Sequence, residues 1–135
     1  MKLLLFQAKK FYWASYSKTL DDVPEQDVAN TVEDALVVFL HAEAEDEENP
    51  KVETKAVKNI KWLANKRNLK NVVLHSFTHL SGSTASAEFA QDFLNRLDTR
   101  LTGTGYQVWQ TPFGYFCEWD LSVYGDSLAK VFKEI

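Results

Sequence analysis

The sequence has little of several features that would fix the class of the protein at once. A single cysteine, Cys117, in 135 residues excludes an intramolecular disulfide framework and suits a reducing compartment. The apolar run near the start, Leu3 to Phe6, ends at Gln7. It is too short for the apolar core of a signal peptide, about 7–15 residues, or for a membrane-spanning helix of about 20. We therefore expect a cytoplasmic protein with no membrane partner.

Glycine and proline are also scarce, at five and three residues. The glycines form neither a GxGxxG nor a Walker pattern, so no phosphate-binding loop is indicated. What is present is a composition that can build a core, with 45% apolar and 13% aromatic residues and a formal net charge of −4. Such a chain is too apolar and too aromatic to be disordered. Its length favours one domain, which we place at residues 1–135.

The spacing of apolar residues predicts an α/β domain with a mixed sheet and flanking helices. We expect strands at 3–6, 11–16, 34–41, 71–74, 106–109 and 115–123, and a polar loop at 19–30. Helices are expected after Pro50, over 89–101 and after Gly125, each on the basis of an apolar stripe. The stripes are Val52, Ala56, Val57, Ile60, Leu63 and Ala64; Phe89, Ala90, Phe93, Leu94, Leu97 and Leu101; and Leu128, Val131, Phe132 and Ile135.

Acidic residues gather between Glu43 and Glu48, directly before Pro50. We interpret this run as a solvated connection. Pro50 is suited to opening a helix, and acids stabilise the positive end of the helix dipole.

Two strand ends carry residue types that are unusual for packing alone. Residues 75–81 place imidazoles and hydroxyls directly after a buried strand, where parallel sheets present ligand sites. Residues 111–116 form a rigid turn whose glycine permits close approach of the backbone. The two segments together predict a small pocket lined by backbone amides.

The reactive side chains leave alternatives open. Cys117 beside a histidine can form a thiolate nucleophile, but a lone cysteine on the apolar face of a strand is typical of packing, and we favour packing. A zinc site would need His75 and His79 together with His41 or Cys117. On an extended segment a spacing of four does not place two histidines on one face, so we expect no metal.

Basic residues are concentrated between residues 51 and 70. This is the pattern of an exposed helix face, and also of a patch that meets a phosphate backbone. The residues are Lys51, Lys55, Lys58, Lys61, Lys66, Arg67 and Lys70.

Several segments, in order, resemble the N-terminal editing domain of archaeal threonyl-tRNA synthetases over essentially the whole chain. They are Val37–Leu40 followed by Glu43, the Asn49-Pro50 helix start, Phe77-Thr-His-Leu-Ser81, Asp92–Arg96 and Pro112-Phe-Gly-Tyr115. The resemblance implies the fold of D-aminoacyl-tRNA deacylases and a homodimer. It implies hydrolysis of serine from mischarged threonine tRNA, bound by its acceptor end, with no DNA partner and no cofactor. A full-length synthetase would also use ATP, Mg and Zn. The end at Ile135 is what we expect of a domain excised from a longer synthetase.

The same resemblance assigns residues to roles. Substrate-binding positions are Ala42, Glu43, Ser76, Phe77, Thr78, Pro112, Phe113, Gly114 and Tyr115, and catalytic positions are His79, Phe116 and Cys117. The tRNA-binding residues would be Lys51, Lys55, Lys58, Lys61, Lys66 and Arg67. Phe116 and Cys117 stand where the family has Tyr and Lys. Because that lysine is the family's leading side-chain candidate for promoting hydrolysis, we expect this chain to edit with help from the 2′-OH of the terminal adenosine.

Two rival interpretations share this evidence. Ser76-Phe-Thr78 partly matches the SQFTL motif of D-aminoacyl-tRNA deacylases, but the Gln is absent. Their GPVT motif is absent too, with Thr111-Pro-Phe-Gly114 in its region. The other rival is a non-catalytic module for tRNA binding or dimerisation.

Overall fold

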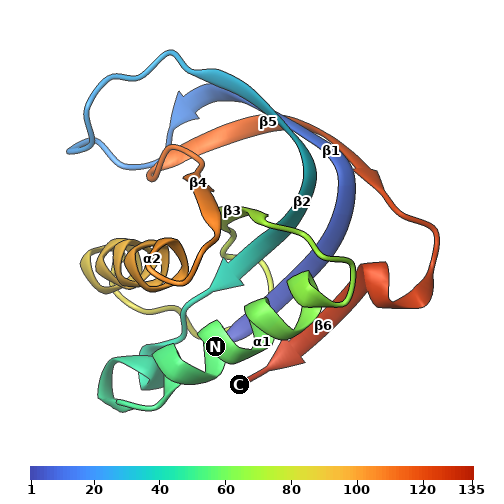
Figure 1. The fold of residues 1–135 in the computed structure, drawn as a ribbon. Coiled ribbons are helices and arrows are strands. Elements are labelled where there is room, and N and C mark those ends of the chain that lie inside the picture. Colours follow the sequence, from blue (N-terminus) through green and yellow to red (C-terminus); the bar gives the residue numbers. More distant parts are fainter.

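The computed structural model describes all residues, 1–135, as one six-stranded sheet with two helices (Figure 1). The strands lie in the order β4-β3-β2-β1-β5, and β6 also pairs with β1. The pairs β2–β3 and β3–β4 are parallel, whereas β1 pairs antiparallel with β2, β5 and β6. The elements are β1 Lys2–Lys18, β2 Ala29–His41, α1 Val52–Asn65, β3 Asn71–Ser76, α2 Ala87–Thr102, β4 Gln107–Gln110, β5 Tyr115–Val123 and β6 Lys130–Glu134, with short 3-10 helices at η1 Ala44–Glu48 and η2 Ser127–Ala129.

The prediction of two separate strands at 3–6 and 11–16 is wrong, because β1 is continuous. The alternation of buried and exposed residues slips at Lys9 and Lys10, which are both exposed. The pairing with β5 shifts register there, and Asp34 on β2 has a φ of 48°. A bulge of this kind bends and twists a strand without ending it. From sequence, the slip resembles a break between strands.

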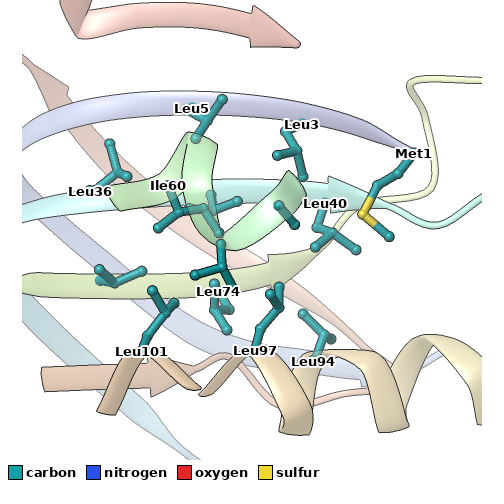
Figure 2. Close-up of a cluster of buried hydrophobic side chains, with 14 of the residues drawn as sticks. Met1, Leu3, Leu5, Leu36, Leu40, Ile60, Leu74, Leu94, Leu97 and Leu101 are labelled. Carbon is teal, nitrogen blue, oxygen red and sulfur yellow. The ribbon is translucent and has the colours of Figure 1, made fainter. Parts of the chain in front are cut away.

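The main core lies between one face of the sheet and the two helices. On β2, Leu36, Val38 and Leu40 point into it, and every residue predicted for the α1 stripe is buried there. Figure 2 shows leucines of β1, β2, β3 and α2 meeting around Ile60 of α1. The helical period of apolar residues therefore identified this layer correctly.

A second, smaller cluster occupies the opposite face and holds the alternate residues of β2, Ala35, Val37 and Phe39. The rings of Phe39 on β2 and Trp119 on β5 lie 5.0 Å apart, although β1 separates the two strands in the sheet. The sheet therefore curls so strongly that β5 covers part of β2. This curvature is visible in Figure 1, where β1 and β2 bend together.

The predicted last helix is also wrong, since residues 130–134 form strand β6 after a single turn of 3-10 helix. Val131 and Ile135 are partly buried against the main core, whereas Phe132 is 49% exposed. Their partners are on the first residues of β1, Lys2 to Phe6. The helical spacing was coincidental, and pairing with the distant N-terminal strand decides the conformation.

The acidic run is only partly a solvated connection. It forms η1 with Glu43 directly before it. Glu43 and Asp46 are 4% and 3% exposed, while Ala44, Glu45, Glu47 and Glu48 face solvent. Neither helix of the protein is long and apolar enough to cross a membrane.

Candidate active site at the carboxyl edge of the sheet

A cavity of about 460 Å³ opens where β3 and β4 end and β5 begins. This volume is within the range of small-ligand sites, roughly 300–1,000 Å³. The two segments predicted to form a pocket do meet here. Among the residues proposed for substrate binding and catalysis, the cavity is lined by Ala42, Ser76, Phe77, Thr78, His79, Pro112, Phe113, Gly114, Tyr115, Phe116 and Cys117.

The turn before β5 holds the cavity in shape. Gly114 has a φ of 78°, and a Cβ at this position would lie 2.7 Å from Cγ1 of Val23. Its carbonyl accepts the N–H of Thr19 at 2.7 Å. The hydroxyl of Tyr115 donates to the carbonyl of Pro24 at 2.9 Å and accepts the N–H of Gln26 at 2.8 Å. Only glycine fits here, and the turn thereby pins the β1–β2 loop beside the cavity.

Glu43 is the one predicted substrate-binding residue that does not line the cavity. Its carboxylate is bound by the α-ammonium of Met1 at 2.6 Å, by Nζ of Lys2 at 3.0 Å and by the hydroxyl of Ser81 at 2.6 Å. Burial alone would raise the pKa of Glu43, but these hydrogen bonds outweigh burial and lower the pKa to about 2. Glu43 is thus a charged anchor for the segment after β3.

His41, at the end of β2, belongs to the same anchored region. It is completely buried, its Nδ1 accepts the N–H of Leu80 at 3.0 Å, and its Nε2 lies 3.2 Å from the hydroxyl of Thr84. Both ring nitrogens are therefore used within the protein. The accepted hydrogen bond places the imidazole proton on Nε2.

His75, at the end of β3, differs from His41 because it faces the cavity. Its Nδ1 lies 2.7 Å from the hydroxyl of Thr111, and its ring is packed against Phe39, Phe77 and Trp119. Burial lowers the pKa of His75 to about 4, so the imidazole is neutral at neutral pH.

The two side chains with the strongest catalytic expectation lie in the lining without activating partners. His79 is exposed, and its ring meets the ring of Phe77 edge-on with centroids 5.0 Å apart. Cys117 is half-buried, and burial raises its pKa, so its sulfur is a neutral thiol. A neutral thiol is a poor nucleophile compared with a thiolate.

Sequence reasoning missed several wall residues. It placed His75 and Thr111 in the two pocket segments but gave neither a role in catalysis or substrate binding, and it did not assign Trp119 to the site. The loop residues Thr19 and Leu20 and the start of α2 also contribute. Polar or aromatic residues at a strand end were the available signal for His75 and Thr111.

The predicted basic residues lie on α1 and the turn after it, not in the cavity. Because α1 returns antiparallel from the carboxyl end of β2, Lys51 and Lys55 are at the cavity's edge of the sheet, while Lys66 is at the opposite edge. Lys51, Lys55, Lys58 and Lys66 are exposed and Lys61 is partly exposed. Arg67 is engaged within the protein by Gln7, Asp126 and the ring of Tyr124.

The zinc hypothesis receives no geometric support. No three His, Cys, Asp or Glu side chains are grouped so that they could hold a metal ion.

Comparison with known proteins adds an independent line of evidence. A family model described as the archaea-specific editing domain of threonyl-tRNA synthetase matches residues 1–135. Threonine–tRNA ligases from Methanosphaera stadtmanae and Staphylothermus marinus are 33% and 34% identical over all of this chain, which spans 22% of their length. A solved c-Myc DNA unwinding element binding protein, 14% identical, superposes with a TM-score of 0.72 over 100% of this chain and 99% of its own. That similarity shows the D-aminoacyl-tRNA deacylase-like fold.

Proposed function

The chain belongs to the archaea-specific editing domains of threonyl-tRNA synthetase, and we propose that it hydrolyses L-serine from mischarged threonine tRNA in the cytoplasm. The attacking group is a water molecule, positioned by the 2′-OH of the terminal adenosine and by backbone groups. The observation that carries this proposal is a cavity at the carboxyl edge of the sheet whose side chains include no activated nucleophile.

Two residues of the cavity lining have backbone N–H groups without a partner in the protein. The N–H groups of Thr78 and His79 donate to no acceptor within the protein, whereas the flanking N–H groups of Phe77 and Leu80 are bound by Leu40 and His41. Free N–H groups in a cavity can stabilise the negative charge that develops on an ester oxygen during attack by water. An ester is reactive enough to need positioning more than a powerful nucleophile.

Discrimination follows from size. A site that activates threonine cannot strongly reject serine, because the lack of one methyl group changes the binding free energy by only about 1–3 kcal/mol. A second site that excludes the larger threonine can remove the error. The cavity is lined by the small side chains of Ala42, Ala85 and Ala90 and by the rigid ring of Pro112, a lining that favours exclusion of the larger amino acid.

The acceptor end of the tRNA is the proposed partner. Lys51, directly before α1, and Lys55 and Lys58 on α1 are exposed, and this row begins at the cavity's edge of the sheet. They are therefore the strongest candidates for contact with the phosphate backbone. Changing all three to Glu should weaken tRNA binding and flatten its dependence on salt. Unchanged binding would remove this surface from the proposal.

We further propose that the domain is a homodimer. Strand β6 pairs on one side only, with β1, and carries the exposed Phe132. An unpaired edge with an exposed aromatic ring suits pairing with a second copy. Light scattering should give twice the mass of the chain, and Phe132→Asp should halve it; a monomeric wild-type chain would contradict the dimer.

The deciding experiment is single-turnover deacylation of threonine tRNA charged with L-Ser, L-Thr or D-Ser, each with a terminal 2′-OH or 2′-deoxy adenosine. Rapid loss of L-Ser alone, abolished by the 2′-deoxy terminus, is the expected result. A preference for D-Ser would instead assign the chain to chiral proofreading. No cleavage of any ester would leave a tRNA-binding or dimerisation module.

A further inference from the structure

His75 is a buried imidazole with one ring nitrogen left over. The residue is 6% exposed, and Nδ1 is paired with the hydroxyl of Thr111. Nε2 has no hydrogen-bond partner in the protein, yet no buried side-chain nitrogen or oxygen is without one. Nε2 therefore reaches accessible space, and the space that His75 lines is the cavity of the proposed active site.

The partner of Nδ1 decides which nitrogen carries the proton. The Thr111 side chain is buried, and Nδ1 of His75 is the only protein atom that its hydroxyl pairs with. Donation from the hydroxyl to Nδ1 places the proton of the neutral ring on Nε2, the nitrogen that reaches the cavity.

The surrounding rings fix the orientation of this donor and favour the neutral form. Phe39 and Trp119 lie with their centroids 5.1 and 5.8 Å from the His75 ring, and Trp119 meets it at 80°. These rings exclude water from the imidazole, and the loss of hydration lowers the pKa of His75. A neutral imidazole held in this way remains a donor without changing charge when pH varies above about 5.

We propose that the Nε2–H of His75 donates a hydrogen bond to the carbonyl oxygen of the aminoacyl ester, a contact that strengthens as this oxygen becomes negative. The inference rests on the proposed hydrolysis. In that step the water oxygen bonds to the carbonyl carbon, and the carbonyl π pair moves to its oxygen. The pair then returns and expels the ribose 3′-oxygen, which takes one proton of the water. The other proton leaves to solvent, and serine departs as its carboxylate. His75 gains and loses no proton.

The resemblance implies that other members have a lysine at the position of Cys117. The proposed contact gives the cavity of this chain a side-chain donor from a different position, His75. Thr111 is then a positioning residue, since it acts on the substrate only through His75. The two residues lie on adjacent segments, β3 and the turn after β4, which the parallel pairing of Leu74 with Gln110 brings together.

The test compares three variants and one control variant of the 135-residue chain. His75→Phe keeps a ring but removes the donor, and should lower the single-turnover rate constant about 100-fold, as loss of an oxyanion donor does. Its affinity for the non-hydrolysable amide, 3′-seryl-amino-3′-deoxyadenosine, should stay nearly unchanged. His75→Gln can place an amide N–H near the position of Nε2 and should recover part of the rate. Thr111→Val should give a smaller loss, and Thr102→Val, at the end of α2, none.

Nitrogen-15 NMR of the histidine rings gives a readout that a merely structural role would not move. We expect Nε2 to be protonated and Nδ1 unprotonated in the wild type, a mixture in Thr111→Val, and a shift of the Nε2–H signal when the amide analogue is added. An Nδ1–H tautomer, a signal indifferent to the analogue, or a wild-type rate in a folded His75→Phe would each overturn the inference. If the wild type hydrolyses no seryl ester, the proposed function fails, and the response to the analogue still decides the role of His75.

Discussion

The carboxyl ends of β2 and β3 are neighbours in the sheet, and each carries a buried histidine, but the two ends are built differently. At the end of β2, His41 and Glu43 have every polar atom paired within the protein. At the end of β3, His75 has one nitrogen paired and the other facing a cavity. Buried polar residues thus hold the structure together at the end of β2, which we call the closed end, and line the cavity at the end of β3, which we call the open end. A side chain can act on a substrate only if the fold leaves one of its polar atoms unpaired. We therefore place catalysis at the end of β3.

The largest effect should come from breaking the closed end with Glu43→Gln. Removing this charge leaves the buried Met1 ammonium with Asp46 as its remaining carboxylate partner and leaves Lys2 with none, and we expect a loss of about 3 kcal/mol in the free energy of unfolding. Urea denaturation at pH 7 measures it. Glu45→Gln is the matched control, because Glu45 is exposed and its carboxylate accepts one hydrogen bond, from the hydroxyl of Ser83. A loss no larger than that of the control would show that the anchor is not structural.

The same carboxylate predicts how stability depends on pH in acid. The pKa of Glu43 is about 2 in the folded protein, against an ordinary value of 4.5. Between these values the unfolded chain binds a proton that the folded chain does not, so stability falls as the pH drops from about 4.5 to about 2. Glu43→Gln should show a shallower decline across this window than the wild type.

The next effect concerns the turn that closes one side of the open end. Gly114→Ala would place a side chain at a positive φ and against Val23, and we expect a loss of about 1–3 kcal/mol together with slower deacylation. Gly82→Ala, with open space around it, is the control. Adding Val23→Ala to Gly114→Ala should restore part of the stability, since it relieves the contact but not the φ. An unchanged Gly114→Ala would mean that the loop is not pinned by this turn.

A smaller effect should distinguish the two histidine environments through pH. His75 has a folded pKa of about 4 and an ordinary value of 6.5. Below pH 6.5 the unfolded chain gains a proton that the folded chain refuses, so stability should fall by on the order of 1–2 kcal/mol between pH 7 and 5. His75→Phe should lose this decline, whatever its stability at pH 7. His79→Phe should keep it, because His79 is exposed. Equal slopes in the wild type and His75→Phe would contradict a buried neutral His75.

What could be predicted from sequence follows the same division between local and non-local structure. The α1 stripe was correct to the residue because helical period is a local property and all six members are buried. Strand β6 was misread because Val131, Phe132 and Ile135 are compatible with a helix until the chain pairs with β1. Likewise, the bulge at Lys9 and Lys10 looks like a strand end unless the pairing across it is known.

The candidate site shows the same limit. The two segments that form most of the cavity were found because polar residues at strand ends are a local signal. Trp119 and Leu20 were not assigned to it, since they reach the cavity only through the curl of the sheet and the pinned β1–β2 loop. Glu43 was placed beside the substrate, whereas its partners in the structure, Met1, Lys2 and Ser81, are about 40 residues away on either side of it in the sequence. Ion pairs between residues so far apart in the sequence cannot be predicted from any local sequence pattern.

The smallest expected effect is that of Cys117→Ala. Burial keeps the Cys117 sulfur as a thiol, and the proposed reaction uses water, so the single-turnover rate on L-seryl-tRNA should change by no more than about threefold. The same assay on Cys117→Lys, which restores the residue that the family pattern has here, sharpens the test. If His75 and the 2′-OH supply the stabilisation that this reaction needs, added lysine should raise the rate only slightly. A collapse of the rate in Cys117→Ala would instead mean that the Cys117 thiol takes part in hydrolysis, and that Nε2 of His75 is not the main catalytic group.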